Sequence, residues 1–347
     1  MEIDREKFAP EELTRCLEHY DLGRVESMQE FARGSARSPK VVITAAAGKF
    51  VFKRRAPGRN DLAKVTFTHQ IQQILADRGF PLPGLVPTRK GDTILVLGSN
   101  VYEMFHHIAG GSYDGSLKAT RSAGRTLASF HSLLADFHSE FHLPTGSYHK
   151  AHSIPKAMRT IVSVLPLDRR PPIKAVKGTT RWLTESYRFC GEQAEAAGLH
   201  LWPKQIVHGD WHPGNMLFRD QEIAAVVDYD AARLQQRVID LANGALQFSI
   251  IGGGDDTAFW LDEADLPRFG EFMRGYIEVS PISSQELRAV PFLMCEALIA
   301  EAVLPIATTG SFGRLEGFGF LSMIRRKVAW ILKHLPELRR ATKPAAS

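Results

Sequence analysis

The chain has 347 residues, of which 44% are hydrophobic and 23% charged, values typical of a globular protein with room for two lobes. Its net charge of +5 is mildly basic, and the sequence has no long basic run of the kind that nucleic-acid binding requires. The three cysteines, Cys16, Cys190 and Cys295, are too far apart for a disulfide framework or a zinc site. The N-terminus does not resemble a signal peptide, and no apolar run approaches membrane length. We therefore expect a cytoplasmic protein with no nucleic-acid or membrane partner; its oligomeric state stays open.

The first hundred residues predict a small antiparallel sheet with one long helix. In chain order, the hydrophobic patterns and turn residues predict a short helix over 10–20, strands over 25–31, 40–45 and 49–54, a helix over 61–79, and strand segments at 87–88, 93–97 and 100–105. Gly79 and Pro81 end the long helix. This order predicts a five-stranded lobe over residues 1–106.

Helical periodicity dominates the remainder of the chain. Helices are expected over 117–137, 179–197, 238–250, 265–278, 284–304 and 316–335. The segment 145–180 is rich in Pro, His and Lys and predicts irregular structure or short helices, and residues 341–347 predict a disordered tail. The second lobe would then be mostly helical and span residues 107–340.

The most informative stretch is IVHGDWHPGNMLF, residues 206–218, followed by AVVDYDA, residues 225–231. Short strands bounded by turn residues would carry Asp210, Asn215 and Asp228 to one edge. Their spacing matches the catalytic and metal loops of kinases. Asp210 would orient a substrate hydroxyl, Asn215 and Asp228 offer the oxygen ligands that Mg²⁺ prefers, and His208 would fix the loop. The alternative is an ordinary polar hairpin.

These residues resemble the aminoglycoside phosphotransferase and choline kinase-like superfamily, whose loop reads H-G-D-x-H-x-x-N. Tyr229 and Asp230 stand where protein kinases carry Phe-Gly, and no A-P-E-like element follows, which argues against a protein kinase. The resemblance implies an α+β, bilobal protein-kinase-like fold and transfer of the γ-phosphate of ATP, with Mg²⁺, to a small-molecule hydroxyl. It also implies Asp210 as catalytic base and Asp240 as a residue that steadies the loop. The segments FPLPGLVPTRKGD and YEMFHHIAGG are more similar to the homoserine kinase type II and spore-coat-like branches.

The same resemblance implies a nucleotide site in the first lobe. Lys53 would contact the α- and β-phosphates, although a solvated lysine or a shift to Arg54 or Arg55 stays open. A loop over 33–38 with Ser35 would cover the phosphates, and a plain hairpin turn is the alternative. The adenine would bond backbone groups at Glu103, Phe105 and His107, between the apolar side chains of Val51, Met104 and Leu217.

The sequence departs from the kinase pattern at the expected partner of Lys53. Kinases pair this lysine with a Glu on the following helix, but residues 54–79 contain no Glu, only His69 and Gln70 at suitable distance. Another acid holds the lysine, or the nucleotide supplies its counter-charge. The missing Glu also motivates an alternative function, a nucleotide-binding pseudokinase that serves as a scaffold without acceptor turnover.

Several further groups stay ambiguous. His208 and His212 have a zinc-like spacing, but the intervening Gly and Pro break the helix that such a site needs. Glu296 and Glu301 lie on an apolar helix and either line the acceptor pocket or pair with Arg274 or Arg325. The sequence does not name the acceptor, nor does it decide between ATP and GTP.

Overall fold

The computed structural model describes residues 5–31, 34–138, 144–166, 171–254 and 256–342. The chain packs into two compact units, one of Met1–Ser112, His138–Pro144 and Asn215–Ala232, the other of Tyr113–Phe137, Thr145–Gly214 and Arg233–Ser347. The chain passes from one unit to the other between Gly214 and Asn215, inside the HGDWHPGN loop. The lobe bounds 1–106 and 107–340 stay a prediction. Arg33 and the tail from residue 343 lie outside the described residues.

The first unit is built on the predicted five-stranded antiparallel sheet. Its strands are β1 (Val25–Glu30), β2 (Lys40–Ala45), β3 (Gly48–Arg54), β4 (Ile94–Leu97) and β5 (Asn100–His106), and their order in the sheet is β1-β2-β3-β5-β4. The prediction of the sheet is therefore confirmed. The segment 87–88 forms no strand, and Leu85 makes an isolated bridge to Phe105 instead.

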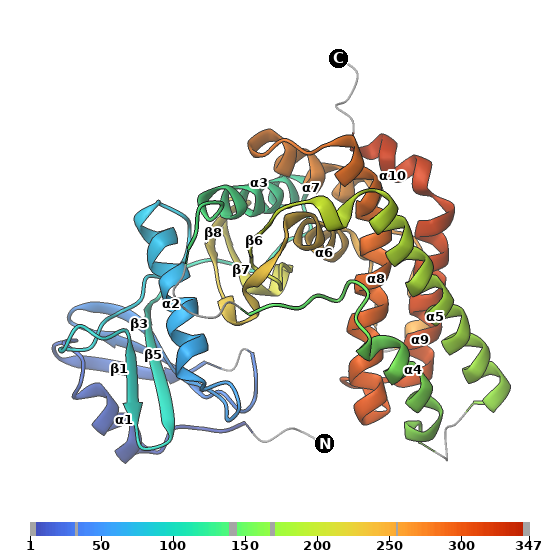
Figure 1. Ribbon diagram of the computed structural model, residues 1–347. Coiled ribbons are helices and arrows are strands. Elements are labelled where there is room, and N and C mark those ends of the chain that lie inside the picture. Colours follow the sequence, from blue (N-terminus) through green and yellow to red (C-terminus); the bar gives the residue numbers. More distant parts are fainter. Residues whose placement is uncertain (1–4, 32–33, 139–143, 167–170, 255, 343–347) are drawn as a thin grey trace. The chain divides into compact units, whose positions relative to one another are not determined.

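Strand alternation gives the two faces of this sheet different chemistry. One face is apolar, and its side chains form a core with α1 (Pro10–Leu17): Ile43, Phe50, Phe52 and Met104 pack with Leu13, Cys16 and Tyr20. The opposite face carries Lys40, Lys53 and Glu103. α2 (Leu62–Asp77) lies along the sheet and reaches Glu103 through His69 (Figure 1). Lys40, Lys53 and Glu103 therefore lie on the face opposite the apolar core.

A hairpin that follows the catalytic loop belongs to the first unit. β7 (Met216–Arg219) and β8 (Glu222–Val226) pair around Asp220 and Gln221, both with positive φ. The hairpin is joined to the rest of the unit by the bridge from Phe218 to Gly111 and by the bond from Val226 N to Pro81 O at 2.9 Å. The turn η3 (Tyr229–Ala231) follows it. The unit thus brings Asn215 and Asp228 into the same packed body as Lys53.

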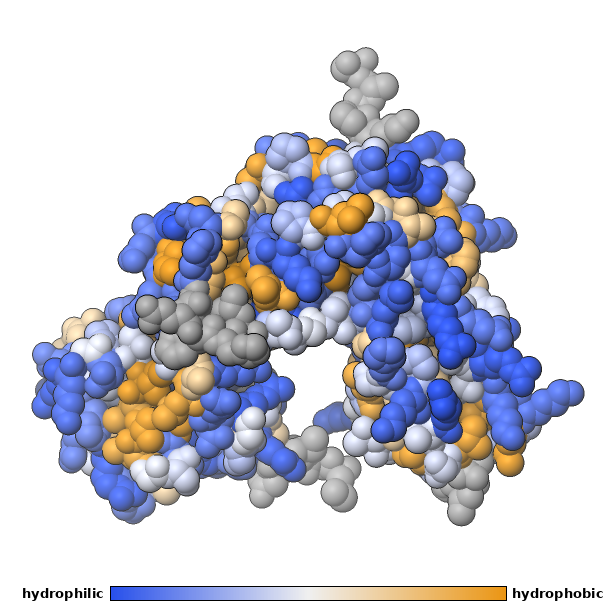
Figure 2. Space-filling view, in the orientation of Figure 1, coloured by the Kyte–Doolittle hydropathy of each residue, from blue (hydrophilic) through white to orange (hydrophobic). Residues whose placement is uncertain are grey.

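The second unit is mostly helical, as expected (Figure 1). Its helices are α3 (Leu117–Leu133), α4 (Ser153–Val164), α5 (Ile173–Ala196), α6 (Arg237–Ser249), α7 (Leu266–Val279), α8 (Ser284–Thr309), α9 (Gly317–Lys333) and α10 (Leu335–Ala341). Its short strands are β6 (Lys204–Val207) paired with β9 (Arg233–Gln236), and β10 (Ser311–Phe312) paired with β11 (Leu315–Glu316). Strand β9 was not predicted, and α5 begins six residues earlier than the helix expected from residue 179. Figure 2 shows that the outer surface of α5 is largely hydrophilic.

Two glycines allow α3 and α7 to cross closely. A Cβ on Gly124 would lie 2.0 Å from the Phe272 oxygen, and one on Gly275 would lie 2.1 Å from the Arg121 oxygen. Any larger residue at either position would push the two backbones apart. This crossing matters for the site because α3 supplies His131 to the anchor of the catalytic loop.

The expectation that no apolar run approaches membrane length is wrong for helix α8. By length and composition alone, Ser284–Thr309 could cross a membrane. Of its most apolar stretch, 83% is buried inside the protein, as in the central helix of a globular core. Glu296 and Glu301 interrupt this apolar run in the sequence.

Candidate active site

The catalytic loop is held by Asp240, which lies in the first turn of α6. Its carboxylate accepts hydrogen bonds from the backbone N–H groups of His208 at 2.9 Å and Gly209 at 3.0 Å. His131 Nε2 lies 3.1 Å from the same carboxylate. Burial raises the pKa of Asp240, but the histidine contacts and the backbone bond outweigh it and lower the pKa. The expected role of Asp240 in steadying the loop is confirmed by these bonds.

His208 is fully buried. Its ring packs edge-on against Phe130 and Trp211, with ring centroids 5.8 and 5.3 Å away. A side chain enclosed in this way helps to shape the loop by packing, and the catalytic role of His208 stays a prediction.

Asp210 is the accessible acid of the loop, with 48% of its side chain exposed. His212 Nε2 lies 3.6 Å from Asp210 Oδ2, and His212 Nδ1 accepts the N–H of Gly214 at 3.0 Å. Because Nδ1 is an acceptor, the ring proton of a neutral His212 lies on Nε2 and faces Asp210. Within the described ranges, no group of three or more His, Cys, Asp or Glu residues is placed to hold a metal ion.

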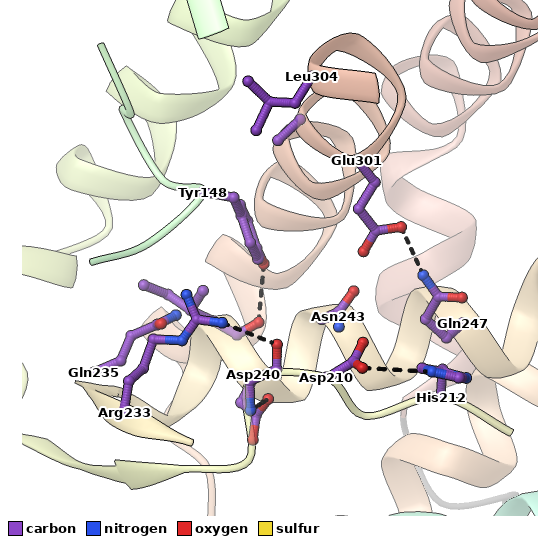
Figure 3. Close-up of a pocket in the computed structure, with 13 residues that line it drawn as sticks. Tyr148, Asp210, His212, Arg233, Gln235, Asp240, Asn243, Gln247, Glu301 and Leu304 are labelled. Carbon is purple, nitrogen blue, oxygen red and sulfur yellow. Dashed lines mark hydrogen bonds and ion pairs between the residues drawn. The ribbon is translucent and has the colours of Figure 1, made fainter. Parts of the chain in front are cut away.

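Asp210 lines a pocket of about 460 Å³ that lies wholly within the second unit (Figure 3). Glu301 projects from α8 toward it, and its carboxylate accepts a hydrogen bond from Gln247 at 2.8 Å. Asn243 and Arg233 also line the pocket. The lining therefore includes three acids (Asp210, Asp240 and Glu301), three side-chain amides and the cation of Arg233.

The pKa of Glu301 is raised to about 7. Its side chain is open to the pocket, but protein atoms surround it, and this desolvation is the main cause. The negative charge of Asp210 raises the pKa further, while the bond from Gln247 lowers it. The sequence left open whether Glu301 lines a pocket or pairs with an arginine. In the structure it lines the pocket.

Glu296 neither lines this pocket nor pairs with Arg274 or Arg325, and its partners lie in another segment. Its carboxylate bonds His149 Nδ1 at 2.6 Å and the backbone N–H of Lys150 at 3.1 Å. These bonds fix the segment that carries Tyr148, whose hydroxyl donates to Ile239 O at 2.9 Å and lines the pocket. The sequence could not show this, because His149 and Glu296 are 147 positions apart in the chain.

The first unit supplies the acid that the sequence lacked beside Lys53. Lys53 Nζ lies 3.6 Å from Glu103 Oε2, and the two residues are direct cross-strand partners on β3 and β5. Arg55 Nη1 donates to Glu103 at 2.6 Å, and His69 Nε2 lies 2.8 Å from it. Burial raises the pKa of Glu103, but Lys53, His69 and Arg55 outweigh it and lower the pKa to about 2.

The position of this acid explains why it was missed. The counter-charge comes from a neighbouring strand instead of the helix, and the strand order that pairs β3 with β5 is needed to find it. Arg54 turns to the other face, where it pairs with Glu12, so the register assigns the charged face to Lys53. Met104 opposes Phe52 in the core, so its expected place beside the adenine is wrong.

Asn215 and Asp228 lie at the two ends of the β7–β8 hairpin. The Asn215 carbonyl accepts the N–H of Val227 at 2.9 Å, which holds the ends together. Asp228 has φ 66° and ψ 74°, a left-handed conformation that strains a non-glycine residue and is typical of functional positions. Next to it, Asp230 is bonded to Arg55. One amide and one carboxylate suit a Mg²⁺ ion that takes its remaining ligands from phosphates and water.

The other expected nucleotide contacts also lie in the first unit. Ser35 is exposed in the β1–β2 turn, where its Oγ accepts the N–H of Arg37 at 3.3 Å. Phe105 opposes Val51 on the charged face, and the N–H of His107 donates to Lys49 O at 2.9 Å just after β5. The roles of Ser35, Phe105 and His107 stay predictions.

Comparison with known proteins identifies the class. Residues 27–272 match the model of the phosphotransferase enzyme family known as APH, and the chain belongs to this family. It is 26% identical over 328 residues to a homoserine kinase of Methylocella silvestris, with 90% of this chain and 93% of the relative covered. A homoserine kinase of Xanthobacter autotrophicus is 25% identical, with 82% and 81% covered.

Solved structures share the fold at low sequence identity. An aminoglycoside phosphotransferase from Alicyclobacillus acidocaldarius superposes with a TM-score of 0.69 at 16% identity and covers 94% of this chain and 95% of its own. A microcompartment-associated aminopropanol kinase gives a TM-score of 0.68 at 15% identity, with 94% and 97% covered. The expected kinase-like fold and the phosphotransferase class are thus confirmed.

Proposed function

We propose that this phosphotransferase moves the γ-phosphate of ATP, bound with Mg²⁺, to the hydroxyl of a small amine-bearing metabolite, with Asp210 as catalytic base. The observation that carries the proposal is the pocket beside Asp210, where an acceptor hydroxyl can reach an accessible carboxylate. Phosphoryl transfer depends on positioning and charge neutralisation, so a base that orients the hydroxyl is the main demand on the protein.

The charges of the pocket support an acceptor with an amino group. Glu301 and Asp210 present carboxylates, and Asn243 and Gln247 add neutral hydrogen-bonding groups. An ammonium ion gains from such partners, whereas a second anion would be repelled. Arg233 offers a cation for an acceptor that also bears a carboxylate. Homoserine has both groups, and relatives of this chain are named homoserine kinases.

The nucleotide end of the proposal rests on the first unit. Lys53, held by Glu103, would contact the α- and β-phosphates, and Asn215 and Asp228 would hold Mg²⁺. The metal, when bound, neutralises phosphate charge and bridges phosphate oxygens. Glu103 also weakens the pseudokinase alternative, because the missing counter-charge of Lys53 was its motivation. The three buried free cysteines suit a reducing cytoplasm.

The test is ADP release measured across an acceptor panel of homoserine, 1-amino-2-propanol, choline and an aminoglycoside. We expect turnover with at least one amine-bearing alcohol. Asp210→Ala should lower kcat by about 10²–10⁴-fold, the usual contribution of a positioned base, and leave the Kd for ATP within about twofold. Asp77→Asn, which changes an exposed acid at the end of α2, is the control and should behave as the unmodified protein.

Two results would contradict the proposal. ATP binding without acceptor-dependent ADP release across the panel would favour the scaffold. Full turnover by the Asp210→Ala variant would remove Asp210 as the base.

A further inference from the structure

A second lysine lies beside Lys53 on the charged face of the sheet. Lys40, the first residue of β2, is the direct cross-strand partner of Lys53, so the two side chains leave the same face. Both side chains are partly buried. Like charges directly opposite each other destabilise a sheet, and partial burial adds to this cost. Such a pair is expected where a polyanion binds.

Gly34, in the turn between β1 and β2, lies close to the Lys40 ammonium. Gly34, with φ 82°, approaches so closely that a Cβ there would lie 2.6 Å from Lys40 Nζ. Arg5 Nη1 also donates to Gly34 O at 3.2 Å, which brings a third cation to the turn. The turn expected to cover the phosphates therefore lies directly on Lys40.

The carboxylates around Lys40 include the expected metal ligand. The charges of Asp228 and Asp230 raise the pKa of Lys40, whereas the charges of Lys53 and Arg5 lower it. Burial, followed by the charge of Lys53, lowers the pKa of Lys40. Asp230 is shared with Arg55, and Glu103 is shared by Lys53, Arg55 and His69. Once Asp228 ligates a cation, Lys40 loses part of its counter-charge, and phosphate oxygens are the natural replacement.

We propose that Lys40 and Lys53 form a paired-lysine site for the nucleotide polyphosphate, in which Lys40 is a second phosphate-contacting residue. The inference rests on the proposed use of a nucleotide but not on the identity of the acceptor. Two ammonium groups at one register position can bind different oxygens of the same α,β-phosphate segment. The site therefore selects nucleoside di- and triphosphates over nucleosides.

The experiment measures Kd for ATP, ADP and adenosine by calorimetry, without acceptor, in the full-length protein. Lys40→Met should weaken ATP and ADP by about tenfold or more, the usual loss for one charged hydrogen bond, and change adenosine by less than about twofold. Lys53→Met removes the expected phosphate contact, and its loss of ATP affinity is the reference for the effect of Lys40→Met. Lys64→Met removes an exposed lysine of α2 in the same unit and is the control.

The ratio of adenosine to ATP affinity is read within each variant, so partial unfolding of Lys40→Met does not disturb it. A rise of about threefold or more in that ratio, absent from Lys64→Met, supports the proposal. A smaller change overturns it and leaves Lys40 as a structural partner of Asp228 and Asp230. If the unmodified protein binds no ATP, the proposed function fails first, and the two failures are thereby distinguished.

Discussion

Glu103 is buried and Glu301 is open to the pocket, and their surroundings shift their pKa values in opposite directions. Glu103, in the sheet unit, is contacted by Lys53, Arg55 and His69, and its pKa is lowered to about 2 despite burial. Glu301, in the helical unit, has a neutral amide as its hydrogen-bond partner and Asp210 nearby, and its pKa is raised to about 7. The more deeply buried acid has the lower pKa, so the charged partners of Glu103 outweigh its burial.

The comparison separates two kinds of acid. The charge of Glu103 is fully compensated inside the protein, which suits a residue that holds Lys53 in place whatever is bound. The pKa of Glu301 is raised to about 7, and under the proposed function its carboxylate gains a cationic partner when the amino group of the acceptor enters the pocket. The first acid is expected to matter for stability and the second for acceptor binding.

The largest expected effect follows from removing Glu103, the acid whose charge is compensated by neighbouring basic side chains. Glu103→Gln leaves Lys53 and the buried Arg55 without their shared anion, and the loss of one partner of a buried ion pair costs about 3–5 kcal/mol. All five tryptophans lie outside the sheet unit, so hydrogen exchange of β3 and β5 is the suitable measurement. We expect faster exchange there and little change in tryptophan fluorescence.

The control and the pH dependence sharpen this prediction. Glu30→Gln breaks an exposed pair with Lys7, 64% exposed on both sides, and should cost at most about 1 kcal/mol. Because the folded pKa of Glu103 lies below its ordinary value of 4.5, its contribution is present above pH 4.5 and is lost as pH falls toward 2. The variant should lack that acid-dependent loss. If β5 is equally protected from hydrogen exchange in Glu103→Gln and Glu30→Gln, Glu103 is not the anion that holds Lys53 and Arg55 in place.

The sequence predicted the two ends of the site unequally. The spacing of Asp210, Asn215 and Asp228 is local, and so are the strand and helix periods, so both the fold and the loop could be predicted. The Lys53–Glu103 pair depends on strand order, because β5 adds beside β3 across a helix and another strand. The Glu301 pocket depends on how α6 and α8 pack, and a helix that is apolar nearly all round gives no indication of which acid faces a cavity.

The next largest effect concerns the titrating acid. With an amine-bearing acceptor, KM should fall as pH rises through about 7, because Glu301 becomes charged there. Glu301→Gln should raise KM by about tenfold at pH 8, the loss of one charged hydrogen bond, and by less than about threefold at pH 6. Steady-state kinetics over pH 5.5–8.5 measure both.

Glu185→Gln, an exposed acid on α5, is the control for charge alone. The same shift also affects stability. Because the folded state holds a proton that the unfolded chain releases, the free energy of unfolding should fall between pH 4.5 and 7 in the unmodified protein, and less so in Glu301→Gln. Parallel KM profiles for the variant and the unmodified protein would exclude Glu301 from acceptor binding.

The smallest expected effect tests the cause of the Glu301 shift. Gln247 donates to the Glu301 carboxylate at 2.8 Å and lowers its pKa, so Gln247→Leu should raise that pKa further. The pH at which KM falls should move upward by about one unit or less, the range that one neutral hydrogen bond supplies. Gln247→Glu should move it further, because a second carboxylate then faces the first. Gln285→Leu, at the exposed start of α8, should leave the profile in place. A downward shift in Gln247→Leu would mean that the amide faces the carboxyl with its oxygen, and the raised pKa of Glu301 would then have desolvation, Asp210 and this amide oxygen as its causes.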